Sequence, residues 1–130
     1  MAYYLDTSAA VKLVVKERGS SALLRWLSRE QDHVLSSDLL RTELLRATRR
    51  GAPRHMERAR AVLDSIVILN LTTSTFERAA ELDAERLRSL DALHLAAALE
   101  LGDDLDGLIT YDDRLGEGAR AYGIRVIAPH

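Results

Sequence analysis

Short β-like runs alternate with longer helical patterns along the whole chain of 130 residues, and this alternation constrains the fold more than any other feature. Aromatic and β-branched residues predict strands at 2–6 and 66–71, and further strands are predicted at 33–36, 107–111 and 125–127. Strands that are separated by helices need crossover connections, which pair them in parallel and cover both faces of the sheet. The sequence therefore predicts an α/β protein, a three-layer α/β/α sandwich with a mostly parallel central sheet.

Helices are predicted from apolar spacing, caps and chain breakers. They are expected at 7–17, from Ser20 or Ser21 to about Gln31, at 38–50 with Asp38 as the cap, and at 53–65, 72–87, 89–102 and 112–122. Between Leu90 and Leu101 only three residues are not apolar, so this helix is predicted to be central and largely buried.

Composition narrows the class of protein. With 47% hydrophobic and 29% charged residues, the chain is an ordinary globular protein, and its length predicts one domain over residues 1–130. The absence of cysteine excludes disulfides, thiolate zinc sites and thiol nucleophiles. No apolar run approaches the roughly 20 residues that span a bilayer. The N-terminus also lacks the pattern of a signal peptide, so we expect a cytoplasmic protein without membrane contact.

Charge is unevenly distributed although the net charge is only −2. Residues 41–60 hold seven arginines: Arg41, Arg46, Arg49, Arg50, Arg54, Arg58 and Arg60. Guanidinium groups suit phosphate, so this cluster is either a phosphate-binding face or a solvated surface. Residues 100–117 are acidic instead.

Carboxylates follow two of the predicted strands. Asp6 ends the first strand and Asp112 follows the strand at 107–111. In an open parallel sheet, ligands bind beyond the carboxyl ends of the strands, so both side chains would face one crevice if the strands are neighbours. The alternative is that each aspartate caps the helix that follows it, which is a common role of aspartate.

Two further carboxylates occupy unusual helical positions. Glu43 lies on an apolar stripe, where a buried carboxylate must be paired, protonated or bound to a cation; a salt bridge to an arginine is the alternative. Asp91 begins the apolar helix, where the helix dipole would also stabilise it. His94, one turn later, is expected to be a core histidine or a support for other side chains rather than a ligand.

Carboxylates gathered in one crevice repel one another and cannot all ionise unaided. A divalent cation resolves this repulsion, and oxygen ligands without cysteine or paired histidines favour Mg²⁺ or Mn²⁺ over zinc. Hydrolysis of phosphodiester bonds is the chemistry that such a site performs.

Four segments in this order resemble the PIN-domain ribonucleases, and specifically the VapC-type toxins of bacterial toxin–antitoxin pairs. They are YYLDTSAAVKLVVKE, SSDLLRTELLRA, LRSLDALHLAAALELG and GLITYDDRL. The resemblance covers essentially the whole chain and implies a Rossmann-like fold.

The resemblance implies an acidic quartet of Asp6, Glu43, Asp91 and Asp112. Asp6 and Asp91 would be the principal metal ligands, Asp112 would complete the site, and Glu43 would act directly or through water. Supporting positions are Thr7, Thr110 and Asp113, the last also an alternative fourth acid. Arg46, Arg49, Arg50 and Arg54 are the weaker prediction for RNA contact.

By the same resemblance, the function would be Mg²⁺- or Mn²⁺-dependent endonucleolytic cleavage of structured RNA, tRNA or rRNA. A cognate antitoxin, a homodimer and an indirect link to DNA through the antitoxin are implied. The alternative is a binding module that acts through its antitoxin and uses the acidic site structurally. Apolar side chains around Trp26 either pack in the core or form a dimer or antitoxin groove.

Overall fold

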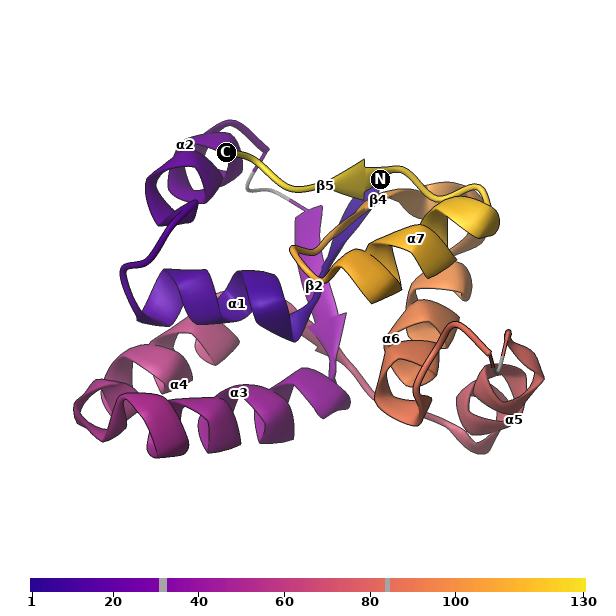
Figure 1. Ribbon diagram of the computed structural model, residues 1–130, viewed down its shortest axis with the longest axis horizontal. Coiled ribbons are helices and arrows are strands. Elements are labelled where there is room, and N and C mark those ends of the chain that lie inside the picture. Colours follow the sequence, from indigo (N-terminus) through magenta and orange to yellow (C-terminus); the bar gives the residue numbers. More distant parts are fainter. Residues whose placement is uncertain (31–32, 84) are drawn as a thin grey trace.

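The computed structural model describes residues 1–30, 33–83 and 85–130, and Figure 1 shows their arrangement. Within these residues, one sheet holds five parallel strands in the order β3-β2-β1-β4-β5. The strands are β1 (Ala2–Leu5), β2 (Val34–Ser37), β3 (Val67–Leu69), β4 (Leu105–Ile109) and β5 (Val126–Ile127). The helices are α1 (Thr7–Val14), α2 (Ser20–Glu30), α3 (Asp38–Gly51), α4 (Met56–Asp64), α5 (Thr73–Glu81), α6 (Ser89–Leu99) and α7 (Asp113–Ala121), with short 3₁₀ turns η2 (Pro53–His55) and η3 (Gly102–Asp104).

The two faces of the sheet carry separate cores because successive side chains of a strand point to opposite faces. Tyr4 packs with α5, α6 and α7, whereas Leu5 packs with α1, α2, α3 and α4. Leu108 and Ile109 of β4 divide in the same way. Figure 1 shows the two helical groups on either side of the sheet, which confirms the three-layer α/β/α prediction.

The chain reverses its direction of travel across the sheet between β3 and β4. From β1 it moves outward through β2 to β3, and then crosses back through α5 and α6 to place β4 on the other side of β1. Leu5 pairs with Ile109, and the backbone N–H of Asp6 donates to the carbonyl of Ile109 at 3.0 Å. The carboxyl ends of β1 and β4 therefore form the switch point where α/β proteins bind ligands.

One helix is much shorter than its pattern predicts. The prediction of a helix over 72–87 is wrong, because α5 ends at Glu81 and the chain turns back. Asp83 accepts backbone hydrogen bonds from Glu85 and Arg86 in this turn. Leu87 is thereby buried against Gly118, where an added Cβ would lie 2.6 Å from its side chain. Tertiary packing, rather than a local stop signal, ends this helix.

Other boundaries move by a few residues. The first helix ends at Val14 instead of Glu17, the segment predicted as helix from 53 opens with η2, and the helix from Ser89 ends at Leu99. The predicted end of the second helix at Gln31 lies outside the described residues. The strand predicted at 66–71 is limited to β3, and that at 107–111 begins two residues earlier.

The prediction that Asp38 caps α3 is wrong, because Asp38 is the first helical residue and Ser37 holds the cap position. Ser37 makes no capping hydrogen bond, because its hydroxyl meets Tyr4 Oη at 2.8 Å.

In the part of the chain that the structure describes, none of the helices combines the length and apolar character needed to cross a bilayer.

Candidate functional site

Asp6 is buried where β1 ends, and its carboxylate is held mainly through one oxygen. Oδ2 accepts hydrogen bonds from the Ser8 backbone N–H (3.2 Å), the Ser8 hydroxyl (2.7 Å) and the Thr110 hydroxyl (2.8 Å). Oδ1 lies 3.6 Å from Nε2 of His94. Asp6 therefore caps α1 and still presents its second oxygen to the interior of the site.

Glu43 reaches the same region from the middle of α3. Its Oε1 accepts from the Thr7 hydroxyl at 2.5 Å and lies 2.5 Å from Nε2 of His94. Burial would raise the pKa of Glu43, but the hydrogen bond from His94, the attraction of that ring when charged and the hydrogen bond from Thr7 hold it below its ordinary value. Histidine, rather than the arginine that the sequence offered as an alternative, is thus its partner.

Asp91 and Asp112 stand at the beginnings of two helices. Asp91 lies in the first turn of α6, and Asp112 caps α7 by accepting the Leu115 N–H at Oδ1 (3.1 Å). Burial and the negative charge of Asp112 are the largest causes that raise the pKa of Asp91, and Asp6 adds to them. A backbone hydrogen bond at Arg88 and the proximity of His94 act in the opposite direction. Asp91 is therefore a carboxylate whose charge lacks compensation.

Asp6 and Glu43 are called the inner carboxylates below, and Asp91 and Asp112 the outer carboxylates. Hydrogen bonds occupy Oδ2 of Asp6, Oε1 of Glu43 and Oδ1 of Asp112. Among the described residues, no hydrogen bond reaches the other oxygen of these three side chains. Capping and ligand binding are thus compatible, because each function uses a different oxygen.

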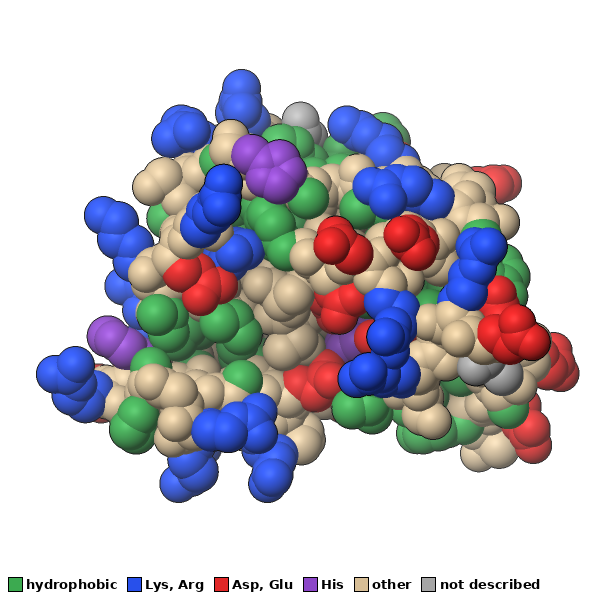
Figure 2. Space-filling view, in the orientation of Figure 1, with side chains coloured by type: hydrophobic (Ala, Val, Ile, Leu, Met, Phe, Trp, Pro, Cys, Tyr) green, Lys and Arg blue, Asp and Glu red, His purple; other side chains and the backbone are tan. Residues whose placement is uncertain are grey.

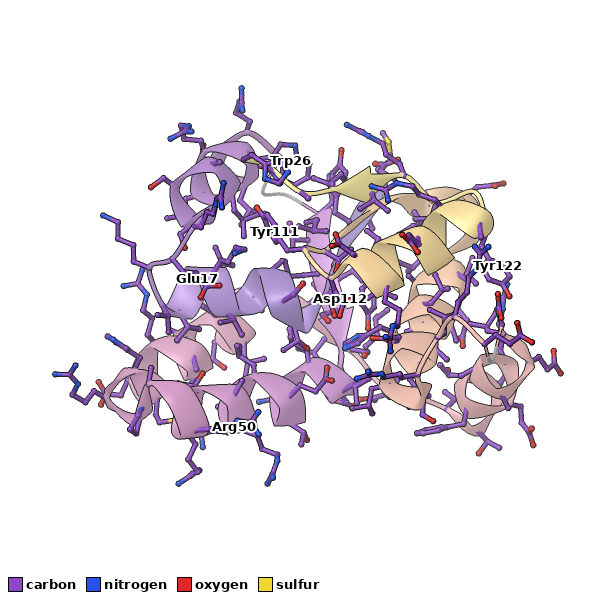
Figure 3. All side chains as sticks on the ribbon, viewed as in Figure 1. Glu17, Trp26, Arg50, Tyr111, Asp112 and Tyr122 are labelled. Carbon is purple, nitrogen blue, oxygen red and sulfur yellow. The ribbon has the colours of Figure 1, made fainter. Side chains whose placement is uncertain are left out.

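A cavity of about 510 Å³ opens over this edge of the sheet. Figure 3 shows Asp112 where the start of α7 approaches the N-terminal end of α1. The lining combines acidic residues with two arginines that the sequence gave no reason to select: Glu43, Arg88, Ser89, Leu90, Asp91, Asp112, Asp113 and Arg114. Asp113 also lines the cavity, but of these two neighbours it is Asp112 whose negative charge raises the pKa of Asp91.

The donor set fits a hard divalent cation. Its members are carboxylates, and Asp6, Glu43 and Asp112 each keep one oxygen that receives no hydrogen bond from a described residue. A cation would also relieve the repulsion at Asp91. Within residues 1–30, 33–83 and 85–130, no three His, Asp or Glu side chains are arranged closely enough to hold a metal ion as they stand. Binding of a cation would therefore require the carboxylate side chains to rotate toward one another.

The arginine cluster lies outside this cavity. Arg46, Arg49 and Arg50 are exposed on α3 and Arg54 is exposed on η2. None of these four forms an ion pair with any described residue. Blue side chains surround the half of the molecule built from α2, α3 and α4 (Figure 2), so this half presents positive charge beside an acidic centre.

The acidic segment at 103–106 lies at the N-terminal end of β4, opposite to the end that carries the site. It forms η3 and the start of β4, whereas the site follows the end of that strand. The segment therefore faces away from the site.

Two supporting side chains escaped the sequence analysis or were undervalued in it. The Ser8 hydroxyl joins Asp6 to the Tyr111 backbone N–H (2.9 Å) and lies 3.2 Å from the Thr110 hydroxyl. His94 is buried and contacts both inner carboxylates. The position of Ser8 two residues after Asp6 is the local signal that could have indicated its role.

The sequence matches the family model described as PIN domain over residues 3–121. It is 42% identical over 128 residues to a protein named Ribonuclease VapC46 of Mycobacterium tuberculosis, covering 98% of each chain. Ribonuclease VapC47 of the same species is 40% identical over 130 residues, covering 97% of this chain and 96% of the relative.

Solved structures share the fold. The VapC20 toxin of Mycobacterium tuberculosis, described as cleaving the sarcin–ricin loop, superposes with a TM-score of 0.77 at 17% identity, covering 98% of this chain and all of the other. A chain of a toxin–antitoxin complex from Klebsiella pneumoniae gives 0.75 at 23% identity, covering 100% and 98%.

Proposed function

Because the chain belongs to the PIN-domain family and, within it, to the VapC type, we propose that it is a Mg²⁺- or Mn²⁺-dependent endoribonuclease, the toxin of a toxin–antitoxin pair. As a single PIN domain over residues 1–130, it would cleave structured RNA, such as tRNA or rRNA, in the cytoplasm. Relatives named as ribonucleases over nearly their full length support this activity.

The observation that carries the proposal is the convergence of four carboxylates from distant parts of the chain. Three of them line one cavity, and Asp6 acts electrostatically on Asp91 beside it. Such an arrangement is unfavourable without a cation and useful with one. Asp6 and Asp91 would be the principal ligands, Asp112 would complete the site, and Glu43 would bind directly or through water; Asp113 is the alternative to Asp112.

A bound divalent cation supplies a Lewis acid that activates water and offsets charge on the phosphate. The chain itself would provide the proton acceptor, since Oε2 of Glu43 and Oδ2 of Asp112 have no hydrogen bond among the described residues. Thr7 and Thr110 would support the site by holding Glu43 and Asp6.

Cationic side chains would bind the RNA backbone. Arg88 and Arg114 line the cavity and are exposed, so each can form a two-point contact with a phosphate. Arg46, Arg49, Arg50 and Arg54 would extend this contact along the neighbouring helices. Their exposure and lack of ion pairs with the described residues support this role.

A cognate antitoxin and a second copy of the chain are the proposed protein partners, with DNA bound only through the antitoxin. Toxin–antitoxin complexes among the structures of the same fold support the first. A groove of about 410 Å³ beside α1, α2 and α4 is lined by apolar side chains, among them Leu13 and Leu24, and by cationic ones, among them Lys16 and Arg58. An acidic amphipathic segment would fit it.

The test is cleavage of an RNA hairpin by the purified protein. We expect cleavage with Mn²⁺, none in EDTA, and none from Asp91→Asn, with circular dichroism confirming that the variant is folded. Arg78→Ala, an exposed change on α5, is the matched control and should cleave as the wild type does. Cleavage that persists in EDTA or in Asp91→Asn would contradict the proposal and favour a binding module.

A further inference from the structure

A buried chain of hydrogen bonds runs from the sheet to Glu43 through His94. Tyr4 Oη lies 2.8 Å from the Ser37 hydroxyl and 2.7 Å from Nδ1 of His94, and Nε2 of His94 lies 2.5 Å from Oε1 of Glu43. Tyr4 and Ser37 are fully buried and His94 is 1% exposed. The proposed hydrolysis does not use this series of hydrogen bonds directly, so the series needs a separate explanation.

Both nitrogens of the His94 ring are occupied, and this determines how the ring lies. A flip of the ring would exchange Nδ1 and Nε2 for carbon atoms and break the contacts to Tyr4 and Glu43 together. The Tyr4 ring also meets the imidazole edge-on, with centroids 5.6 Å apart. Burial raises the pKa of Tyr4 above its ordinary value, so its hydroxyl keeps its proton and remains a fixed partner.

The contact with Glu43 selects one of the two carboxylate oxygens. Oε1 meets both His94 and the Thr7 hydroxyl, whereas no described residue donates to Oε2. Glu43 also lines the cavity that holds Asp91 and Asp112. Because Thr7 and His94 both engage Oε1, Oε2 is the oxygen of Glu43 that remains available to a ligand in the cavity.

We propose that His94 is a positioning residue: anchored by Tyr4, it donates from Nε2 to Oε1 of Glu43 and so presents Oε2 to the cavity. The inference rests on the proposed function and deepens it, since it assigns a role to a buried histidine that does not line the cavity. Groups that orient ligating carboxylates in this way typically contribute about 10–100-fold to metal affinity or activity.

Two amide substitutions separate the roles of the two ring nitrogens, because each keeps a nitrogen near only one of the two positions. The amide nitrogen of His94→Gln can reach the place of Nε2 and keep the donor to Glu43. The shorter His94→Asn places its amide near Nδ1 and keeps only the contact with Tyr4. We expect His94→Asn to lower kcat for RNA by about 10–100-fold with little change in KM, and His94→Gln to rescue most of that loss. Equal kcat in the two variants would overturn the inference.

A second measurement needs neither metal nor RNA. A long-range ¹H–¹⁵N correlation spectrum of the metal-free protein should show a proton on Nε2 of His94, and its resonance should move in Glu43→Gln. A ring that carries its proton only on Nδ1, or an Nε2 resonance that Glu43→Gln leaves in place, would overturn the positioning role. A wild type that does not cleave RNA would refute the proposed function instead, and the spectrum would then decide the role of His94 alone.

Discussion

The inner and outer carboxylates are held at or beside the same cavity by different means. Asp6 and Glu43 are held by neutral hydroxyls, a backbone N–H and a buried histidine, with three donors on one oxygen of Asp6 and two contacts on one oxygen of Glu43. Asp91 and Asp112 are placed by the starts of two helices, and Asp112 repels Asp91. The inner pair is therefore held by hydrogen bonds within the protein, whereas Asp91 in the outer pair is repelled by Asp112 and Asp6, a repulsion that a bound cation would offset.

The largest expected effect comes from neutralising one member of each pair. Asp6→Asn and Asp91→Asn should both reduce RNA cleavage to background, but their effects on the metal-free fold should have opposite signs. Asp6→Asn removes charge-assisted hydrogen bonds and should lower the free energy of unfolding by about 1–3 kcal/mol. Asp91→Asn removes repulsion and should raise it modestly.

Urea unfolding in EDTA measures both changes. If the two variants shifted the unfolding midpoint in the same direction, the distinction between the inner and outer carboxylates would be wrong.

The pH dependence of stability should sharpen the same contrast. The pKa of Asp91 is raised above 3.8, so its charge destabilises the metal-free fold increasingly as the pH rises from 3.8 through the folded value. The pKa of Glu43 is lowered below 4.5, so its charge stabilises the fold above 4.5, and this contribution is lost as the pH falls through the folded value.

Unfolding free energies at several pH values check these signs against the neutral variants. The wild type should lose stability relative to Asp91→Asn on going from acid to neutral pH, and gain stability relative to Glu43→Gln. If the difference in unfolding free energy between the wild type and Asp91→Asn did not vary with pH, the charge of Asp91 would not destabilise the fold.

The smallest effect is expected at the arginines outside the cavity. Single changes of Arg46, Arg49, Arg50 or Arg54 to alanine should weaken RNA binding and reduce the slope of log affinity against log salt by about one for each phosphate that the variant no longer binds. Filter binding at several salt concentrations measures this, with Arg78→Ala as the control. An unchanged slope in all four variants would assign the cluster to solvent or to the antitoxin.

The strands and helices that carry the site could be predicted from the sequence more accurately than the side-chain contacts within the site. Asp6 and Asp112 could be located because each follows a strand, and β1 and β4 prove to be neighbours. Glu43 could be located because a carboxylate on an apolar stripe is unusual. These signals are local or periodic, and a single sequence records them.

The remaining features depend on tertiary packing. His94 contacts Glu43 across 51 residues, and no pattern within the helix distinguishes it from a core histidine. Arg88 and Arg114 line the same cavity only because the N-terminal ends of α6 and α7 lie beside it. The early end of α5 depends on Leu87 packing against Gly118, which local spacing does not reveal.

The central claim is that a bound divalent cation offsets the repulsion among these carboxylates and so stabilises the fold. Thermal unfolding with and without Mn²⁺ tests this claim most directly. At a Mn²⁺ concentration of about 100 times its Kd, the wild type should gain about 2.7 kcal/mol in the free energy of unfolding. Its melting temperature should rise accordingly, and Asp91→Asn should abolish the rise. Superimposable melting curves of the wild type in millimolar Mn²⁺ and in EDTA would contradict the account.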